Sequence, residues 1–261
     1  MRLVSLCPSL TELLFDLGVG DQLVGRTKFC VHPADRVEAI EKVGGTKNPK
    51  IARIVALAPD LVFMNAEENR VEDARALEAA GIRVHSSLPV TPEDTAAMVR
   101  SIAAAVGKAD AGDVIARDIE MRAARVRIAS LGLPPKRFVY LIWREPWMTV
   151  NANTFVSALL ELPGGLNVFG NRGERYPVVT VEDLLAAAPD LMLLSSEPYP
   201  FRTLHADELA TLTGLPRDRI VRCDGELLSW HGSRTPRGID YAERVIRGSS
   251  PGHDDTRDVE R

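Results

Sequence analysis

Residues 51–64 read IARIVALAPDLVFM, and residues 181–194 read VEDLLAAAPDLMLL, 130 positions further along the chain. In both stretches apolar residues recur at i, i+3, i+4 and i+7, which predicts one buried helix face. Pro59 and Pro189 then end the helix, because proline lacks an N–H and clashes with the preceding turn. The apolar run after each Pro-Asp pair is short enough for a buried parallel strand. The repeat therefore predicts two similar α/β lobes with a ligand cleft between them.

The rest of the chain extends this pattern. Short strands alternate with helices on both sides of residues 91–130, which favours a parallel sheet in each lobe. Ser9 and Glu12 have the spacing of a capping box at the start of the first helix. We expect an N-terminal lobe at 1–108, a single bridging helix at 109–131, a C-terminal lobe at 132–248 and a disordered tail at 249–261.

Composition excludes several classes of protein. The formal net charge is −4 and no basic stripe is present, so we expect no nucleic-acid partner. No apolar run approaches the ~20 residues that a membrane span needs. Three irregularly spaced cysteines do not suggest a disulfide framework. As written, the chain shows no export signal, so we expect a cytoplasmic monomer, or a periplasmic or cell-surface protein if the true start lies upstream.

All three tryptophans lie in predicted loops at the carboxyl ends of strands, where ligands bind in open parallel sheets. Trp143, Trp147 and Trp230, with Tyr199, would give flat apolar walls to a large ligand, although tryptophan is also a common packing residue. Lys47 and Arg234 are basic residues close to glycines and could pair with anionic groups of a ligand, or could be solvated charges.

Three other side chains could meet a metal. His231 follows Trp230 and could ligate a metal centre or hydrogen-bond a ligand, or could be a surface histidine. Cys30 and His32 could add metal ligands, although a Cys-x-His pair alone is a weak zinc signal and burial of Cys30 is the plainer interpretation. Dinucleotide, phosphate-loop and serine-hydrolase motifs are absent, which argues against those enzyme classes.

Several segments together resemble a known family. Residues 4–12, 43–45, 54–62, 162–169 and 188–191 are similar to the substrate-binding proteins of ABC importers for cobalamin and ferric siderophores. The resemblance covers residues 2–247 and implies two Rossmann-like lobes joined by one long helix, with a corrinoid or another metal chelate as the ligand. It also implies an acidic residue on each lobe that docks onto an ABC permease, for which Glu67 or Glu72 and Glu197 are the candidates.

We therefore expect a non-catalytic binding protein for a cobalamin-like or other metal chelate, without a covalent cofactor. A cytoplasmic chaperone or sensor for a metal or metal chelate is the alternative. An enzyme that uses Cys30, His32 and His231 is a further hypothesis, and it would require a reactive thiol.

Overall fold

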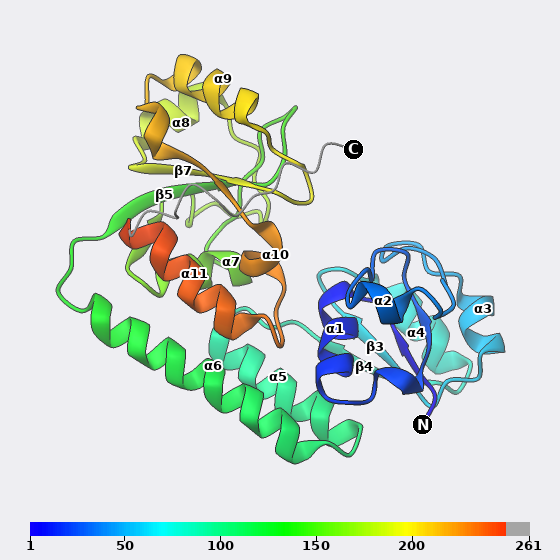
Figure 1. Ribbon diagram of the computed structural model, residues 1–261. Helices are drawn as coiled ribbons and strands as arrows, with labels where there is room; N and C mark the ends of the chain where they lie inside the picture. Colours follow the sequence, from blue (N-terminus) through cyan, green and yellow to red (C-terminus); the bar gives the residue numbers. More distant parts are fainter. Residues whose placement is uncertain (249–261) are drawn as a thin grey trace. The chain divides into compact units, whose positions relative to one another are not determined.

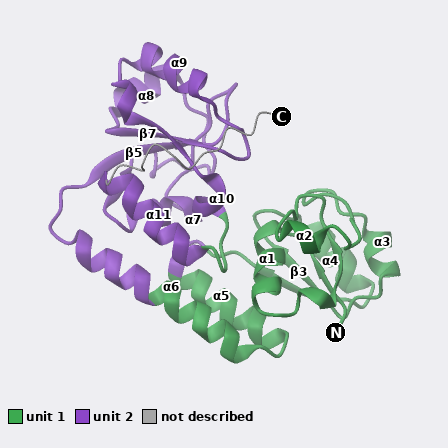
Figure 2. Ribbon diagram, in the orientation of Figure 1, with its two compact units in different colours: residues 1–89, 93–120, 230–234 green, residues 90–92, 121–229, 235–261 purple. Residues whose placement is uncertain are grey.

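The computed structural model describes residues 1–248, and the predicted tail at 249–261 lies outside them. The chain forms two compact units (Figure 2). Unit 1 contains residues 1–89, 93–120 and 230–234, and unit 2 contains residues 90–92, 121–229 and those from 235 onward.

Unit 1 is built on a parallel sheet in the order β2-β1-β3-β4. Its strands are β1 (Leu3–Ser5), β2 (Leu23–Arg26), β3 (Leu61–Asn65) and β4 (Arg83–Ser87). The helices that follow them in the chain are α1 (Pro8–Asp16), α2 (Ala34–Val37), α3 (Ile51–Ala56), α4 (Val71–Ala79) and α5 (Pro92–Ala105), with the short turn η1 (Gly20–Gln22).

Unit 2 has the same strand pattern, in the order β6-β5-β7-β8. Its strands are β5 (Lys136–Leu141), β6 (Gly165–Asn167), β7 (Leu191–Ser195) and β8 (Ile220–Cys223). Its helices are α7 (Phe155–Glu161), α8 (Val181–Ala187), α9 (Thr203–Thr213), α10 (Gly225–Ser229) and α11 (Thr235–Arg247), with η2 at Arg217–Arg219. Figure 1 shows α8 and α9 on one face of this sheet, and α7, α10 and α11 on the other.

The sequence repeat is therefore a structural repeat. β3 and β7 are the matching strands, and every residue in both is buried. Ala58 and Ala188, just before the two prolines, both have left-handed backbone, with φ of 43° and 41°. The aspartate after each proline holds the start of the sheet: Asp60 Oδ2 accepts the backbone N–H of Arg2 at 2.6 Å, and Asp190 Oδ2 accepts that of Arg137 at 2.9 Å.

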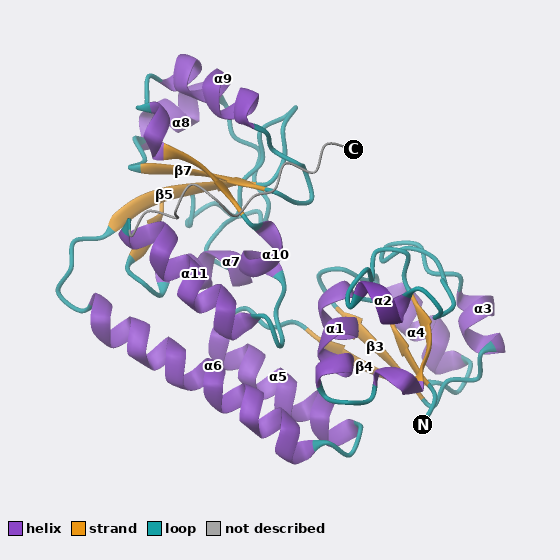
Figure 3. Ribbon diagram, in the orientation of Figure 1, coloured by secondary structure: helices purple, strands orange, loops and turns teal. Residues whose placement is uncertain are grey.

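Apolar side chains pack against both sheets, which explains the apolar runs at 61–64 and 191–194. In unit 1, Val4, Val62 and Met64 pack with Ile54 and Leu77 from α3 and α4. In unit 2, Val139, Met192 and Leu194 pack with Leu184 and Leu209 from α8 and α9. Figure 3 shows the alternation of strands and helices that produces this layering. The predicted α/β fold with two parallel sheets is confirmed.

The helix expected at 109–131 is α6 (Ala109–Ser130), and the division between the two units falls within it, after Glu120. The segment 230–234 belongs to unit 1, although its flanking helices α10 and α11 belong to unit 2. Among residues 1–248, no helix is long and apolar enough to cross a membrane.

The predicted capping box is wrong. Helix α1 begins at Pro8, with Cys7 as its N-cap and no side-chain cap, and Ser9 lies within the first turn. Proline is favoured at this position, because the missing N–H would have no partner there. Glu12 instead binds Arg234.

Candidate functional site

Unit 2 carries an aromatic cluster, which we define as Trp143, Trp147, Tyr199 and Phe201. Tyr199 is at its centre, with ring centroids 4.8 Å from Phe201 and 5.6 Å from Trp143, both edge-to-face. Trp147 stacks parallel to Phe201 at 6.1 Å. Edge-to-face and offset-stacked pairs are the favourable arrangements for aromatic rings. The cluster is therefore a mutually supported set of flat side chains.

A tight turn after β5 presents the two tryptophans. The Met148 N–H donates to the Trp143 carbonyl at 3.1 Å, and the Ile142 N–H donates to the Met148 carbonyl at 3.0 Å. Glu145, at the tip, has a left-handed φ of 63°. The turn leaves Trp143 with 41% of its surface exposed, while Trp147 packs half-buried against the core of unit 2.

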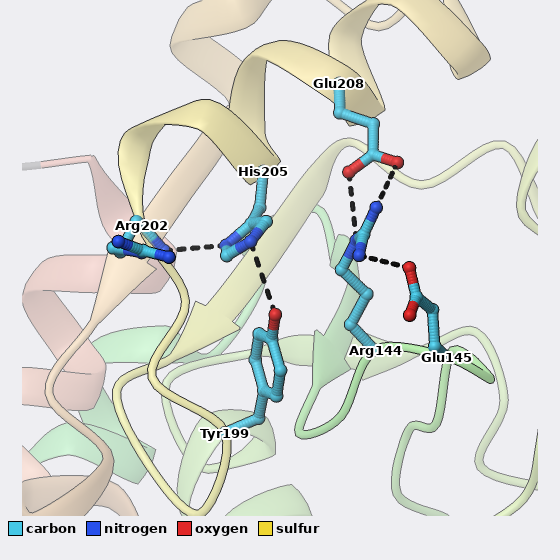
Figure 4. A network of polar contacts seen from close by, with 6 residues as sticks. All are labelled: Arg144, Glu145, Tyr199, Arg202, His205 and Glu208. Atoms are coloured by element: carbon cyan, nitrogen blue, oxygen red, sulfur yellow. Dashed lines mark hydrogen bonds and ion pairs between the residues drawn. The ribbon is translucent and has the colours of Figure 1, made fainter.

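Arg144 lies between the cluster and two carboxylates (Figure 4). Its Nε and Nη2 donate to Glu208 at 3.0 and 2.8 Å, and its Nη1 donates to Glu145. The guanidinium carbon is 5.7 Å from the centre of the Trp147 ring. Hydrogen bonding to Glu208 raises the pKa of Arg144 further above its usual range. The two ion pairs hold this cation against the aromatic ring.

His205 supports Tyr199 from the first turn of α9. Its Nδ1 accepts the backbone N–H of Arg202 at 2.9 Å, and its Nε2 lies 3.3 Å from the Tyr199 hydroxyl. The side chain is 3% exposed. Burial lowers the pKa of His205, and the positive charges of Arg144 and Arg202 lower it further, so the ring is neutral at pH 7.

In unit 1, the segment 230–234 packs against α1. Arg234 donates to both oxygens of Glu12, and its guanidinium carbon lies 4.6 Å from the centre of the Trp230 ring. Trp230 is 9% exposed and meets the ring of His32 edge-on at 5.6 Å. These contacts tie a segment from late in the chain to the N-terminal helix.

His231 lies in a polar cluster of unit 1. Asn65 Oδ1 accepts the backbone N–H groups of Glu67 and Glu68, so the Asn65 atom 3.1 Å from His231 Nε2 is the amide nitrogen. That nitrogen donates, and His231 Nε2 is therefore an acceptor. Ser9 Oγ lies 3.4 Å from His231 Nε2 as well. Burial lowers the pKa of His231 to about 4.

Cys30 is fully buried, and the Thr11 hydroxyl donates to its sulfur at 3.0 Å. Thr27 Oγ1 lies 3.2 Å from the same sulfur. Burial raises the pKa of the Cys30 thiol. Within residues 1–248, no group of three or more histidine, cysteine or acidic side chains is arranged to hold a metal ion. Metal binding by Cys30, His32 and His231 stays a prediction.

The charged candidates lie in loops or in an early helix turn. Lys47 is exposed, and its Nζ donates to the Glu67 carbonyl just after β3. Glu197 follows β7 at the matching place in the repeat and is half-buried. Glu72 is exposed in the first turn of α4. Permease docking by these glutamates stays a prediction.

The structure thus brings Trp143, Trp147 and Tyr199 together in unit 2, and Trp230, His32 and Arg234 together in unit 1. Sequence reasoning did not select Phe201, Arg144, His205 or Glu208. Phe201 and Arg144 lie in the same loops as Tyr199 and Trp143, so their loop positions could have identified them. His205 and Glu208 lie one helical turn apart on α9, and no local pattern separates them from ordinary helix residues.

Comparison with known proteins gives consistent results. The family model described as periplasmic binding protein matches residues 3–216. A vitamin B12-binding protein of Vibrio cholerae serotype O1 is 25% identical over 244 residues, which are 94% of this chain and 87% of that protein. One from Photorhabdus laumondii is 27% identical over 195 residues, 75% of this chain and 70% of that protein.

Two solved structures show the same fold. The periplasmic vitamin B12 binding protein BtuF of Vibrio cholerae has a TM-score of 0.80 and 23% identity, with 94% of this chain and 96% of that chain covered. The periplasmic heme-binding protein RhuT from Roseiflexus has a TM-score of 0.81 and 24% identity, with 94% and 98% covered.

Proposed function

The chain belongs to the periplasmic binding protein family, and from this premise we propose that it binds a corrinoid or another flat metal chelate without catalysis. In this proposal the protein hands the chelate to an ABC permease, as the substrate-binding component of an importer. The relatives with 24–27% identity are named for binding vitamin B12, and they support a corrinoid.

The aromatic cluster is the observation that carries the proposal. Large conjugated ligands are held by flat apolar side chains with a few fixed polar groups beside them. The Trp143 side chain is 41% exposed and packs edge-to-face against Tyr199. The Arg144 guanidinium is a fixed positive charge next to the Trp147 ring. We propose that Trp143, Trp147 and Tyr199 contact the flat face or edge of the chelate.

Charged residues would complete recognition. Lys47 is exposed and suits an anionic group at the edge of the ligand. Arg234 binds Glu12 of α1, His231 binds Asn65, and Trp230 packs against His32 and Arg234. We assign these three residues to shaping unit 1, with a further contact to the ligand. Glu67 and Glu197, at matching places after β3 and β7, remain our candidates for docking to the permease.

A carrier for a metal or metal chelate inside the cell is the second candidate, and the thiols favour it. Cys7, Cys30 and Cys223 are all free and buried, as is usual for proteins of reducing compartments. Immunodetection in separated periplasmic and cytoplasmic fractions decides between the importer component and the internal carrier.

Equilibrium dialysis of the purified protein against cyanocobalamin, dicyanocobinamide, haemin, a ferric siderophore and Zn²⁺ tests the binding proposal. We expect saturable, stoichiometric binding of one chelate at micromolar concentration or below. Binding of Zn²⁺ and of none of the chelates would indicate a metal-binding protein. Absence of binding by every chelate would contradict the proposal.

A further inference from the structure

We propose that His205 is a positioning residue that presents the Tyr199 hydroxyl to the ligand as a hydrogen-bond donor. This inference rests on the proposed function and adds to it the kind of group that the ligand must carry: an acceptor such as a carboxylate or an amide carbonyl. The hydrogen bonds of His205 determine which of its ring nitrogens carries the proton (Figure 4).

The backbone fixes that tautomer. The N–H of Arg202 can only donate, and it lies 2.9 Å from His205 Nδ1, so Nδ1 carries a lone pair and no proton. A neutral imidazole has one ring proton, which is then on Nε2. Nε2 lies 3.3 Å from the Tyr199 hydroxyl oxygen. His205 therefore donates to Tyr199.

This polarity determines what Tyr199 can do. Its oxygen accepts the His205 proton, so its own proton points away from the imidazole and is free to be donated elsewhere. The ring of Tyr199 is held by edge-to-face contacts with Trp143 and Phe201. A tyrosine fixed in this way prefers a ligand with an acceptor at its edge, because a donor there would face the hydroxyl proton.

Burial and nearby positive charge disfavour the protonation of His205. Arg144 and Arg202 face it with positive charge, Glu208 and Glu145 face it with negative charge, and Tyr199 is its hydrogen-bond partner. Burial and the two arginines lower the pKa of His205, and the glutamates oppose them. Below that pKa, Nδ1 gains a proton and can no longer accept the Arg202 N–H, so the helix cap that positions the imidazole beside Tyr199 is lost.

Two substitutions separate positioning from folding. His205→Gln keeps an acceptor for the Arg202 N–H and a donor for Tyr199, since glutamine is a natural partner at the third position of a helix. His205→Glu keeps the acceptor alone, and its carboxylate would accept the hydrogen bond of the Tyr199 hydroxyl. Both variants preserve the helix cap, so both should melt within about 3 °C of the parent protein.

Their binding should differ. With cyanocobalamin and haemin as probes at pH 7.5, we expect His205→Gln to retain affinity within about twofold and His205→Glu to lose about five- to tenfold. Tyr199→Phe should lose a similar amount, and adding His205→Glu to it should cost little more, because the two residues act through one hydrogen bond. Affinity of the parent protein should also fall once the pH drops below the lowered pKa of His205, and that of His205→Gln should not.

Nitrogen-15 NMR of the ligand-free protein adds a readout that no ligand affects: the Nε2-protonated tautomer of His205 is expected. Wild-type affinity in His205→Glu, or an Nδ1-protonated His205, overturns the inference and leaves the binding proposal intact. Failure of the parent protein to bind any probe overturns both.

Discussion

Arg234 forms a paired ion contact with Glu12, 222 residues earlier in the chain: Nε lies 2.5 Å from Oε2, and Nη2 lies 3.0 Å from Oε1. The two side chains are only 14% and 19% exposed. This pair fastens the segment 230–234 to helix α1 within unit 1.

Removing one partner of this pair should destabilise unit 1. Arg234→Met leaves the half-buried Glu12 without its cation, so we expect a loss of about 1–3 kcal/mol in the free energy of unfolding. Urea denaturation, followed by Trp230 fluorescence in a Trp143→Phe/Trp147→Phe background, measures it. Asp207→Asn, which breaks an exposed ion pair with Arg217, is the control and should change stability by less than about 1 kcal/mol. Equal effects of the two substitutions would show that the Arg234–Glu12 pair contributes no more to the free energy of unfolding than an exposed ion pair does.

His231 should make stability depend on pH. Its pKa falls from 6.5 in the unfolded chain to about 4 in the folded protein, because it is buried. Between these values the unfolded chain binds a proton that the folded protein does not, so stability is lost as the pH falls from about 6.5 to about 4, by up to about 3 kcal/mol.

His231→Gln keeps a polar side chain of similar length and removes this titration. Urea midpoints at pH 7.5, 6.5, 5.5 and 4.5 should fall less steeply in the variant than in the parent protein. Both contain His85 and His205, whose pKa values burial also lowers, so the difference between the curves isolates His231. Parallel curves would refute the assignment.

Gly232 should tolerate no side chain, for a reason that lies in the backbone alone. Its φ is 115°, and an added Cβ would meet Leu13 only at an ordinary contact distance of 3.6 Å. Gly232→Ala should therefore cost about 1–3 kcal/mol from backbone strain. Gly173→Ala, at an open position without a positive φ, should be neutral or slightly stabilising. A neutral Gly232→Ala would mean that the segment 230–234 adapts without strain.

The three cysteines should be unreactive in the folded protein. Burial raises the pKa of Cys7 and of Cys223 to about 12, and it raises the pKa of Cys30 as well. Since the thiolate is the reactive form, we expect slow reaction with a chromogenic disulfide at pH 8 and rapid release of three equivalents on unfolding. One rapidly reacting thiol in the folded protein, lost in Cys30→Ser, would revive the hypothesis of a thiol enzyme.

The sequence predicted what depends on local pattern. The apolar spacing around Ile54 and Leu184, the prolines after them and the runs at 61–64 and 191–194 specify helices and buried strands over short distances, and both sheets follow. The grouping of Trp143 with Trp147 and Tyr199 could be expected because their loops follow strands β5 and β7, which are neighbours in the sheet.

Contacts made by a loop that crosses to another part of the fold could not be predicted. The contacts of Arg234 with α1 and of Trp230 with His32 depend on where a loop from late in the chain comes to lie, and no periodicity encodes them. The role of His205 depends on one backbone N–H and one hydroxyl, and its helix gives no sign of them in sequence. Whether a histidine is buried and neutral depends on its tertiary surroundings, and these cannot be read from a single sequence.

The affinity of Trp143→Ala for the chelate that the parent protein binds shows whether the aromatic cluster holds the ligand. Trp143 is 41% exposed, so its removal should leave the fold intact, and Leu166→Ala, at 42% exposure on β6, is a matched control. We predict that isothermal titration shows at least a tenfold weaker Kd for Trp143→Ala and an unchanged Kd for Leu166→Ala, because aromatic side chains dominate binding energy. A Kd for Trp143→Ala within twofold of the parent value would contradict the account.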